Sequence, residues 1–342
     1  MEKSRPLLSI AIPTYNGSRT IKRMMDVLLE QVDERVEVFV ADNCSTDSTS
    51  QIISEYQRTF PFVDYFRNEK NIGADGNFLS CMRNARGKYV YLLSDDDVLT
   101  EGSLKIILNF LESNPEMGLI YLGTGNFYSH YAGKENCTTS QAVANETFCS
   151  KDKTMFMEYA KYYWGFVSSF ILNTDRFRDI NNPEQYFGTY WLQSYIHILC
   201  ASGDNTFLGI VNHLCVGAGV YITQSNFDTS YVDGISYRKM LDCAIDNGFD
   251  KKQLDRWYIN RLSLLASHGI IKEKAAGNRK IDKKQLFLCT RNYWQAWIKI
   301  YPMMFVPNWV CKAYMKYYRR KKGVDYESNL NRAGDVSTDY KG

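Results

Sequence analysis

Short apolar runs alternate with helix-like segments along the first 123 residues, and this order limits the possible folds more than any other feature. Apolar residues recur at helical spacing in the longer segments, whereas the short runs are typical of strands. The alternation predicts an α/β fold with a doubly wound, mostly parallel sheet and helices on both faces. The predicted strands are residues 7–12, 36–42, 63–67, 88–94 and 117–123, and the predicted helices are residues 21–31, 47–58, 74–86 and 100–114.

The pattern changes beyond residue 123. Residues 124–230 mix aromatic strands with a helix, and we interpret them as the second half of a domain that spans residues 1–230. Residues 231–326 have a helical pattern interrupted by a polar linker at residues 272–282. The tail at residues 327–342 has no apolar period and is predicted to be disordered.

Composition excludes several classes of protein. Apolar residues make up 45% of the chain and charged residues 23%, values that are typical of a globular protein. The net charge of +3 is too small to indicate nucleic-acid binding by the whole chain. Nine scattered cysteines indicate reduced thiols, and the short apolar run before Pro13 is too short for a signal peptide. We therefore expect a cytoplasmic protein.

Three consecutive carboxylates, Asp95, Asp96 and Asp97, follow the predicted strand at residues 88–94. Such a cluster is unfavourable because like charges repel, so either a proton or a cation is expected to neutralise it. Mg²⁺ or Mn²⁺ suits carboxylate oxygens and is commonly held by one or two of them together with substrate phosphates. The alternative is a solvated acidic turn in which Asp97 or Thr100 caps the next helix.

Four motifs occur in order at the predicted strand ends and helix starts. They are AIPTYNGS, VADNCSTDST, NEKNIGADGNF and LLSDDDVL, and together they resemble glycosyltransferase family 2, whose members have the inverting GT-A fold. NIGADGNFL, SDDDVL, VSSFIL and YFGT are also similar, more weakly, to the O-antigen abequosyltransferase branch. The resemblance implies a donor half at residues 1–123, an acceptor half at residues 124–230 and a helical C-terminal extension.

The same resemblance implies roles for individual residues. Tyr15 would stack on the nucleobase, and Asp42 would accept a hydrogen bond from it. An ionised carboxylate only accepts hydrogen bonds, so it suits uracil, thymine or cytosine. Gly73 would let the backbone approach the donor. The implied donor-binding residues are Pro13, Thr14, Tyr15, Asp42, Asn71, Gly73, Asn77, Asp95 and Asp96.

The acidic triplet departs from the usual family motif, in which two aspartates flank a variable residue. One alignment makes Asp96 and Asp97 the working pair and puts Ser94 at the first family aspartate; a shift by one residue makes Asp95 and Asp97 the pair. Asp95, Asp96 and Asp97 are therefore all candidate metal ligands, with Mn²⁺ or Mg²⁺ as the implied cofactor.

The expected catalytic base is missing from its usual place. Thr189 and Tyr190 occupy the position of the family's acidic pair. Glu184 is our candidate for the base, and its alternative is a surface glutamate in a loop that contains proline. The other ionisable side chains near this position are Asp175, Asp179 and His197.

Residues 292–323 combine Trp, Tyr, Met and Phe with a basic end. Pro302 and Pro307 interrupt the stretch, so it is not expected to span a bilayer. It suits the surface of an anionic membrane, and the alternative is a helix packed on the body with a solvated charged face.

The predicted function is transfer of a sugar from a UDP, CDP or dTDP donor to a saccharide hydroxyl during surface polysaccharide biosynthesis. The acceptor is expected to be lipid-linked, with the protein peripheral on the inner face of the cell membrane and no nucleic-acid partner. A nucleotidyltransferase and a non-catalytic sugar-binding or scaffold protein are the alternatives. A dehydrogenase is disfavoured because no GxGxxG follows the first strand.

Overall fold

The computed structural model describes residues 5–128, 131–139, 147–160, 164–220, 228, 230–277 and 282–321. These residues divide into two compact units, one within residues 1–223 and 246–249 and the other within residues 224–245 and 250–342. The predicted tail at residues 327–342 lies outside the described residues. The functional division of the first unit into donor and acceptor halves stays a prediction.

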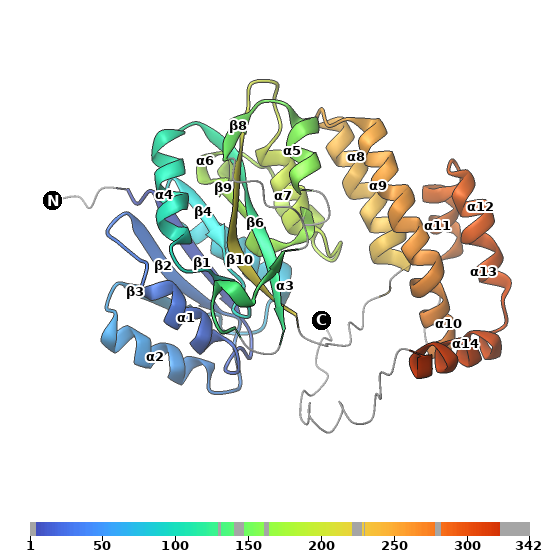
Figure 1. The fold of residues 1–342 in the computed structure, drawn as a ribbon, viewed down its shortest axis with the longest axis horizontal. Helices are drawn as coiled ribbons and strands as arrows, with labels where there is room; N and C mark the ends of the chain where they lie inside the picture. The colour runs from blue at the N-terminus through green and yellow to red at the C-terminus, as the bar shows by residue number, and fades with distance from the viewer. Residues whose placement is uncertain are drawn as a thin grey trace. The chain divides into compact units, whose positions relative to one another are not determined.

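A large sheet forms the centre of the first unit (Figure 1). Its first half is parallel, as predicted, with strands in the order β3, β2, β1, β4. The register aligns the last residues of β1 and β2, since Thr14 pairs with Asp42. These strands are β1 (Leu8–Thr14), β2 (Val36–Asp42), β3 (Val63–Arg67) and β4 (Tyr89–Leu92).

The strands of this half are covered on both faces. Leu8, Ile10 and Ile12 of β1 belong to one buried cluster with apolar residues of α1 (Ile21–Leu29), α2 (Thr49–Thr59) and α4 (Ser103–Ser113). Helix α3 (Gly73–Asn84) also contacts β1, β2 and β4. All seven residues of β1 and of β2 are buried, which explains why both read as continuous runs rather than alternating patterns.

The second half of the sheet is mixed rather than parallel. Strand β9 (Phe170–Asn173) lies between β4 and β6 (Met117–Tyr128) and is antiparallel to both. Strand β10 (Phe207–Val220) is parallel to β6 and antiparallel to the short β5 (Val98–Leu99). A four-residue apolar strand such as β9 gives no local indication of its direction, because long-range pairing decides it.

Short strands and helices complete the first unit. Helix α7 follows the aromatic strand β9, as the mixed pattern of residues 124–230 indicates. The remaining elements are η1 (Lys134–Asn136), β7 (Thr138–Thr139), β8 (Phe148–Ser150), α5 (Lys153–Ala160), η3 (Val167–Ser169), α6 (Thr174–Arg178), η4 (Pro183–Tyr186) and α7 (Leu192–Cys200).

The second unit is helical, as predicted. Asp250 and Asp282 cap α9 and α11, each accepting a hydrogen bond from the backbone N–H three residues later. The predicted polar linker at residues 272–282 lies partly in a helix, α10. The elements are η5 (Ser230–Ser236), α8 (Tyr237–Asp246), α9 (Lys251–Leu264), η6 (Leu265–Ile270), α10 (Ile271–Ala276), α11 (Lys283–Thr290), α12 (Trp294–Lys299), α13 (Tyr301–Phe305) and α14 (Asn308–Lys321).

Candidate active site

The carboxyl ends of β1, β2 and β4 meet at one edge of the sheet, where parallel α/β sheets bind their ligands. Thr14 ends β1, Asp42 ends β2, and the acidic triplet follows β4. The backbone N–H of Asn43 donates to the carbonyl of Thr14 at 2.9 Å, which joins the first two loops. The structure therefore brings these three motifs together at this edge, and the fourth joins them through the asparagines described below.

Asp95 points towards the first loop. Its Oδ2 accepts a hydrogen bond from the hydroxyl of Thr14, and it packs against Gly17. Burial, together with the negative charges of Asp96 and Asp47, raises the pKa of Asp95 to about 7. Near neutral pH this carboxyl group is thus divided between its protonated and ionised forms, as expected for clustered carboxylates without a cation.

Asp97 is 2% exposed and is held by the second half of the domain. Its two carboxylate oxygens accept hydrogen bonds from the Ser168 hydroxyl at 2.6 Å and from the backbone N–H of Gly219 at 3.0 Å. Burial and the charge of Asp96 raise the pKa of Asp97 to about 8. The capping alternative is wrong for Asp97, because α4 begins after Gly102 and Asp97 has other partners.

Asp96 lies between these two and is half-buried. Its side chain accepts a hydrogen bond from the Ser94 hydroxyl at 2.6 Å, and its main-chain carbonyl accepts one from Arg23 of α1 at 3.1 Å. Ser94 and Arg23 thus hold Asp96 through its side chain and through its main chain. Asp95 and Asp96 retain partial exposure, whereas Asp97 is enclosed.

The acidic turn fits a divalent cation only with ligands added from outside the chain. In the part of the chain that the structure describes, no three His, Cys, Asp or Glu side chains are arranged to hold a metal ion together. The arrangement therefore does not bring Asp95, Asp96 and Asp97 together as three ligands of one metal ion. One or two hard carboxylate ligands completed by donor phosphates would match the ordinary preference of Mg²⁺ or Mn²⁺.

Gly17 is a site residue that sequence reasoning missed. A Cβ atom at this position would lie 2.1 Å from Oδ2 of Asp95 and 2.4 Å from the hydroxyl oxygen of Thr14. Only glycine lets the first loop approach the acidic turn this closely. The available signal was the YNGS turn directly after the first strand.

We expect Gly17→Ala to displace Asp95, because neither oxygen can remain in place beside a methyl group. Overpacking of this kind costs about 1–3 kcal/mol, and the predicted donor-binding edge would lose its arrangement. Thermal unfolding and nucleotide-binding titrations measure the two effects. Gly76→Ala on α3 is the control, because the atoms nearest to its Cβ would be side-chain atoms of Ile72 at 3.1–3.3 Å, farther away than those that crowd Gly17. Equal behaviour of the two variants would contradict the close approach.

Tyr15 lies in the first loop and is half-buried, and Pro13 before it is buried in β1. The loop is joined to the loop after β2: the backbone N–H of Asn16 donates to Ser45 Oγ, and Oδ1 of Asn16 accepts from the backbone N–H of Thr46, both at 2.8 Å. Asn16 and Cys44 have positive φ angles, which non-glycine residues adopt mainly in tight turns of this kind. Stacking of Tyr15 on a base stays a prediction.

Asp42 is fully buried and already has partners within the chain. Its carboxylate accepts hydrogen bonds from the backbone N–H of Ser45 and from the hydroxyl of Tyr65, both at 2.8 Å, and lies 3.5 Å from Arg67 Nε. In this conformation Asp42 anchors the loop that follows β2. Its contact with a nucleobase stays a prediction.

Four asparagines anchor the loop before α3. Asn43 donates to Oδ1 of Asn71 at 2.8 Å and accepts from the backbone N–H of Ile72 at 2.9 Å. Asn68 donates to Asn43 and to Asn77, and Asn77 donates to the carbonyl of Ala41. Asn71 and Asn77 therefore hold the loop in place through hydrogen bonds inside the protein. Asn43 and Asn68 are not among the predicted site residues, although both stand in the quoted motifs.

Gly73 begins α3 with a φ of +77°, and a Cβ atom there would meet no atom within 4 Å. Its backbone N–H donates to Oδ1 of Asn71 at 2.8 Å. The glycine thus serves a left-handed turn that favours glycine. Open space above this turn leaves room for a ligand to approach the backbone.

Glu184 lies in η4, on the exposed surface beside the last turn of α3. It forms an ion pair with Arg83 at 2.5 Å. A hydrogen bond from its own backbone N–H, together with Arg83, lowers the pKa of Glu184, which makes the carboxylate a weaker base. His197 is 2% exposed and packs against Phe170, and burial lowers its pKa to about 3, so it belongs to the core.

Asp75 connects the first turn of α3 to the segment that should hold the missing acidic pair. Its Oδ2 accepts a hydrogen bond at 2.8 Å from the backbone N–H of Gly188, the residue directly before Thr189 and Tyr190. Burial raises the pKa of Asp75. Tyr190 has a φ of +64°, an unusual conformation for an aromatic residue that is often found at functional sites.

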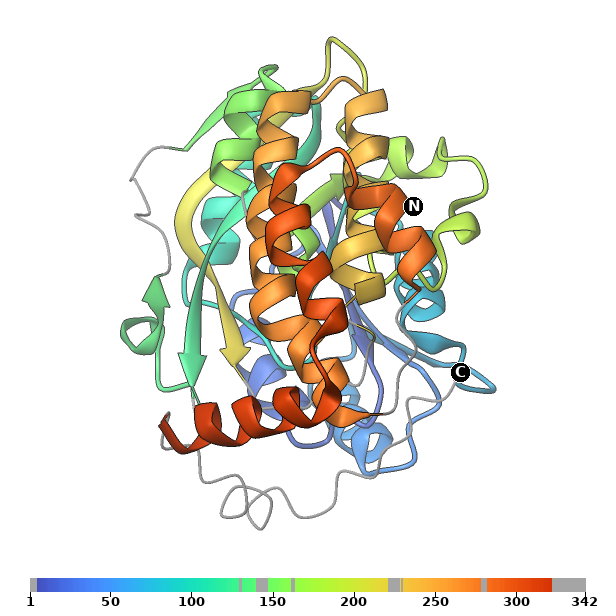
Figure 2. The ribbon, with the colours of Figure 1, turned by 90° about the vertical axis from the view of Figure 1, so that its right-hand side faces the viewer.

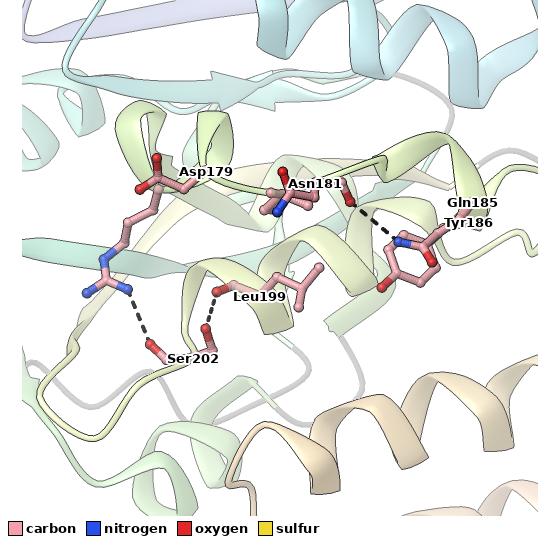
Figure 3. A pocket seen from close by; sticks show the side chains of 8 residues that line it. Asp179, Asn181, Gln185, Tyr186, Leu199 and Ser202 are labelled. Carbon is pink, nitrogen blue, oxygen red and sulfur yellow. Dashed lines mark hydrogen bonds between the residues drawn. The ribbon is translucent and has the colours of Figure 1, made fainter.

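A pocket in the same unit lies beside η4, the short helix that contains Glu184. Several of its polar groups are paired internally: Arg176 donates to the carbonyl of Ser202 at 3.2 Å, and the Ser202 hydroxyl donates to the carbonyl of Leu199 at 2.7 Å (Figure 3). None of the predicted site residues lines it, although Asp179 had been considered near the expected base. Its lining residues are Arg176, Asp179, Ile180, Asn181, Gln185, Tyr186, Leu199 and Ser202.

Segments of this sequence are similar to known proteins. A 116-residue segment is 33% identical to abequosyltransferase RfbV of Salmonella typhimurium and covers 33% of this chain and 35% of that protein. A 199-residue segment is 23% identical to the GalNAc(5)-diNAcBac-PP-undecaprenol beta-1,3-glucosyltransferase of Campylobacter jejuni and covers 56% of this chain and 60% of that protein. The chain thus matches only part of the length of each relative.

Among solved structures, residues 1–349 of S. aureus TarS in complex with UDP-GlcNAc match with a TM-score of 0.61. The match covers 84% of this chain and 81% of that chain at 16% identity, so it concerns the fold alone. The large sheet with its acidic edge is the GT-A architecture of glycosyltransferases, and the predicted fold class is confirmed.

One family model also matches the sequence. It is that of Glycosyl transferase family 2, and the match covers residues 9–165. The predicted resemblance to family 2 and to an abequosyltransferase is confirmed.

Proposed function

We propose that the protein transfers a sugar, a hexose or a deoxyhexose, from a UDP, CDP or dTDP donor to a saccharide hydroxyl, with inversion at the anomeric carbon. The observation that supports this most is the acidic turn at residues 95–97, which lies against Thr14 and Gly17 at the carboxyl edge of a family 2 domain. An α/β sheet binds ligands at this edge.

The donor would lie across the loops that end β1 and β2. Tyr15 would stack on the base, and Asp42 would orient the base while it keeps the hydrogen bonds described above. Asn71, Gly73 and Asn77 would shape the loop that approaches the donor, with Gly73 giving the closest backbone approach. Pro13 and Thr14 would fix the end of β1, and Thr14 would keep Asp95 aligned.

Asp95 and Asp96 would hold a divalent cation, Mn²⁺ or Mg²⁺, together with the donor diphosphate, because both are partly exposed. Such a cation stabilises the charge that develops on the leaving diphosphate. Asp97, which is enclosed by Ser168 and Gly219, would keep the turn in position. Both sequence alignments place Asp97 in the working pair, so direct ligation by Asp97 is the alternative arrangement.

A general base must remove the proton from the acceptor hydroxyl as its oxygen attacks the anomeric carbon. Glu184 was the candidate from sequence, but its ion pair with Arg83 and its lowered pKa make it a weak base. We propose Asp75 instead, because its raised pKa favours proton uptake and it contacts the segment of Thr189 and Tyr190.

The acceptor is proposed to be a lipid-linked saccharide in surface polysaccharide biosynthesis. Support comes from the names of two relatives, an abequosyltransferase and a glucosyltransferase that acts on an undecaprenol-linked saccharide. We propose that the protein works in the cytoplasm, peripherally on the inner face of the cell membrane. None of the helices within the described residues is long and apolar enough to cross a bilayer.

A donor screen tests the proposed activity. Purified protein is mixed with UDP, CDP, dTDP and GDP sugars, with and without Mn²⁺, while thermal stability and donor hydrolysis are measured. We expect a pyrimidine nucleotide sugar to raise the melting temperature only when Mn²⁺ is present, because binding stabilises the folded state. Metal-independent binding without hydrolysis or transfer would instead support the non-catalytic alternative, which the missing acidic pair at Thr189 and Tyr190 favours.

A further inference from the structure

Positive charge is concentrated in one segment near the C-terminus. Residues 283–324 contain ten Lys and Arg residues and no Asp or Glu. The whole chain has a formal charge of +3, so the rest of the chain has a formal charge of −7. We call residues 283–324 the basic segment; the structure describes it up to residue 321, as helices α11 to α14 (Figure 2).

Large aromatic side chains of the basic segment are exposed. Trp294 is 66% exposed, Phe305 is 84% exposed and Trp309 is 73% exposed. Folding normally buries such residues, so large aromatic side chains that stay exposed within one segment point to a surface that contacts something else. The side chains that pack inward are smaller ones, including Ala296, Ile300 and Cys311.

Aromatic and basic side chains share one face of α14. Trp309, Lys312 and Lys316 follow each other at spacings of three and four residues, which places them on the same side of a helix. All three are exposed, and none of the ion pairs between described residues includes Lys312 or Lys316. Their charges therefore remain available to an anionic partner.

We propose that the basic segment docks on the anionic headgroups of a lipid bilayer. Tryptophan and tyrosine rings favour the interface between headgroups and acyl chains, and Lys or Arg residues near that surface bind anionic lipids. A second copy of the same surface is a poor partner, because two segments without any carboxylate repel each other.

This inference deepens the proposed membrane location but can be tested without turnover. The test is co-sedimentation of the full chain with vesicles of phosphatidylcholine alone and with vesicles that also contain phosphatidylglycerol, at low and high salt. We expect binding only to the anionic vesicles, with a loss at high salt because ions screen surface charge.

Paired variants make the test specific. We expect Lys312→Glu with Lys316→Glu to lower the bound-to-free ratio by at least about tenfold, since each basic residue contributes substantially to binding. Phe305→Ser with Trp309→Ser is expected to reduce binding on the same vesicles. Lys105→Glu with Lys252→Glu makes the same charge change at exposed positions outside the segment and should retain binding.

Four results would overturn the proposal. Three are no binding to anionic vesicles, equal binding by the Lys312 and Lys316 variant, and self-association through Phe305 and Trp309 in sedimentation velocity. Preferential binding to nucleic acid over anionic vesicles would also overturn it. Donor-dependent thermal stabilisation, measured in parallel, reports on the proposed activity, so failure of membrane docking and failure of donor binding are separate outcomes.

Discussion

Asp96→Asn is expected to lower sugar transfer by about 100- to 1,000-fold, because loss of a charged group that stabilises the leaving diphosphate has effects of this size. The variant should also lose Mn²⁺-dependent stabilisation by the donor. Initial rates with a pyrimidine nucleotide sugar and thermal melting with and without Mn²⁺ measure both effects. Asp64→Asn is the control, because Asp64 is an exposed strand residue whose charge pairs with Arg86.

Asp95→Asn and Asp97→Asn, compared with Asp96→Asn, show which two carboxylates hold the cation. If Asp95 and Asp96 hold the cation, Asp95→Asn will also lose Mn²⁺-dependent stabilisation, while Asp97→Asn will chiefly lower the melting temperature through Ser168 and Gly219. If Asp97 is a ligand, Asp97→Asn will lose the Mn²⁺ effect and one of the other two will keep it. Full turnover in all three variants would contradict a donor site at this turn.

Asp75→Asn is expected to lower transfer to the acceptor by about 100- to 10,000-fold, because an amide cannot take up the acceptor proton. The substitution keeps the oxygen that accepts the hydrogen bond from Gly188, so the loop should stay in place. Donor binding, measured by titration, should remain near the wild-type value. The expected signature is therefore a fall in kcat without a comparable change in donor affinity.

Glu184→Gln is the matched control for Asp75→Asn, since both replace one carboxylate of this region by an amide. Arg83 and Glu184 lie near the far end of α3, about 12 Å along the helix axis from Asp75. We expect Glu184→Gln to retain transfer. Loss of activity in Glu184→Gln with retention in Asp75→Asn would reverse the assignment and restore the base inferred from sequence.

Local pattern was enough for the first half of the sheet. Strands β1 and β2 are short continuous runs and α1 has a clear helical period, and these elements lie close to the predicted ranges. The second half of the sheet was harder to predict from local pattern, because the direction of β9 depends on pairing with β4 and β6. The polar stretch after residue 271 also continues as helix α10, since pattern alone does not show where a helix ends.

The acidic turn was predictable because three adjacent carboxylates after a strand are conspicuous in any sequence. The individual contacts were not predictable. Ser168 and Gly219 reach Asp97 from positions 71 and 122 residues away along the chain, and no local pattern connects them. Gly17 and Asp75 stand in the quoted motifs, but their roles could not be predicted, because these depend on a close approach and on one long-range hydrogen bond.

The four asparagines that hold the loop before α3 have a further consequence. Amide groups do not titrate in the physiological range and are screened by salt far less than ion pairs between exposed side chains. The hydrogen bonds among Asn43, Asn68, Asn71 and Asn77 therefore keep their strength when protons or ions are exchanged nearby. The sheet edge thus combines a pH-sensitive acidic turn with a frame whose shape is insensitive to pH and ionic strength.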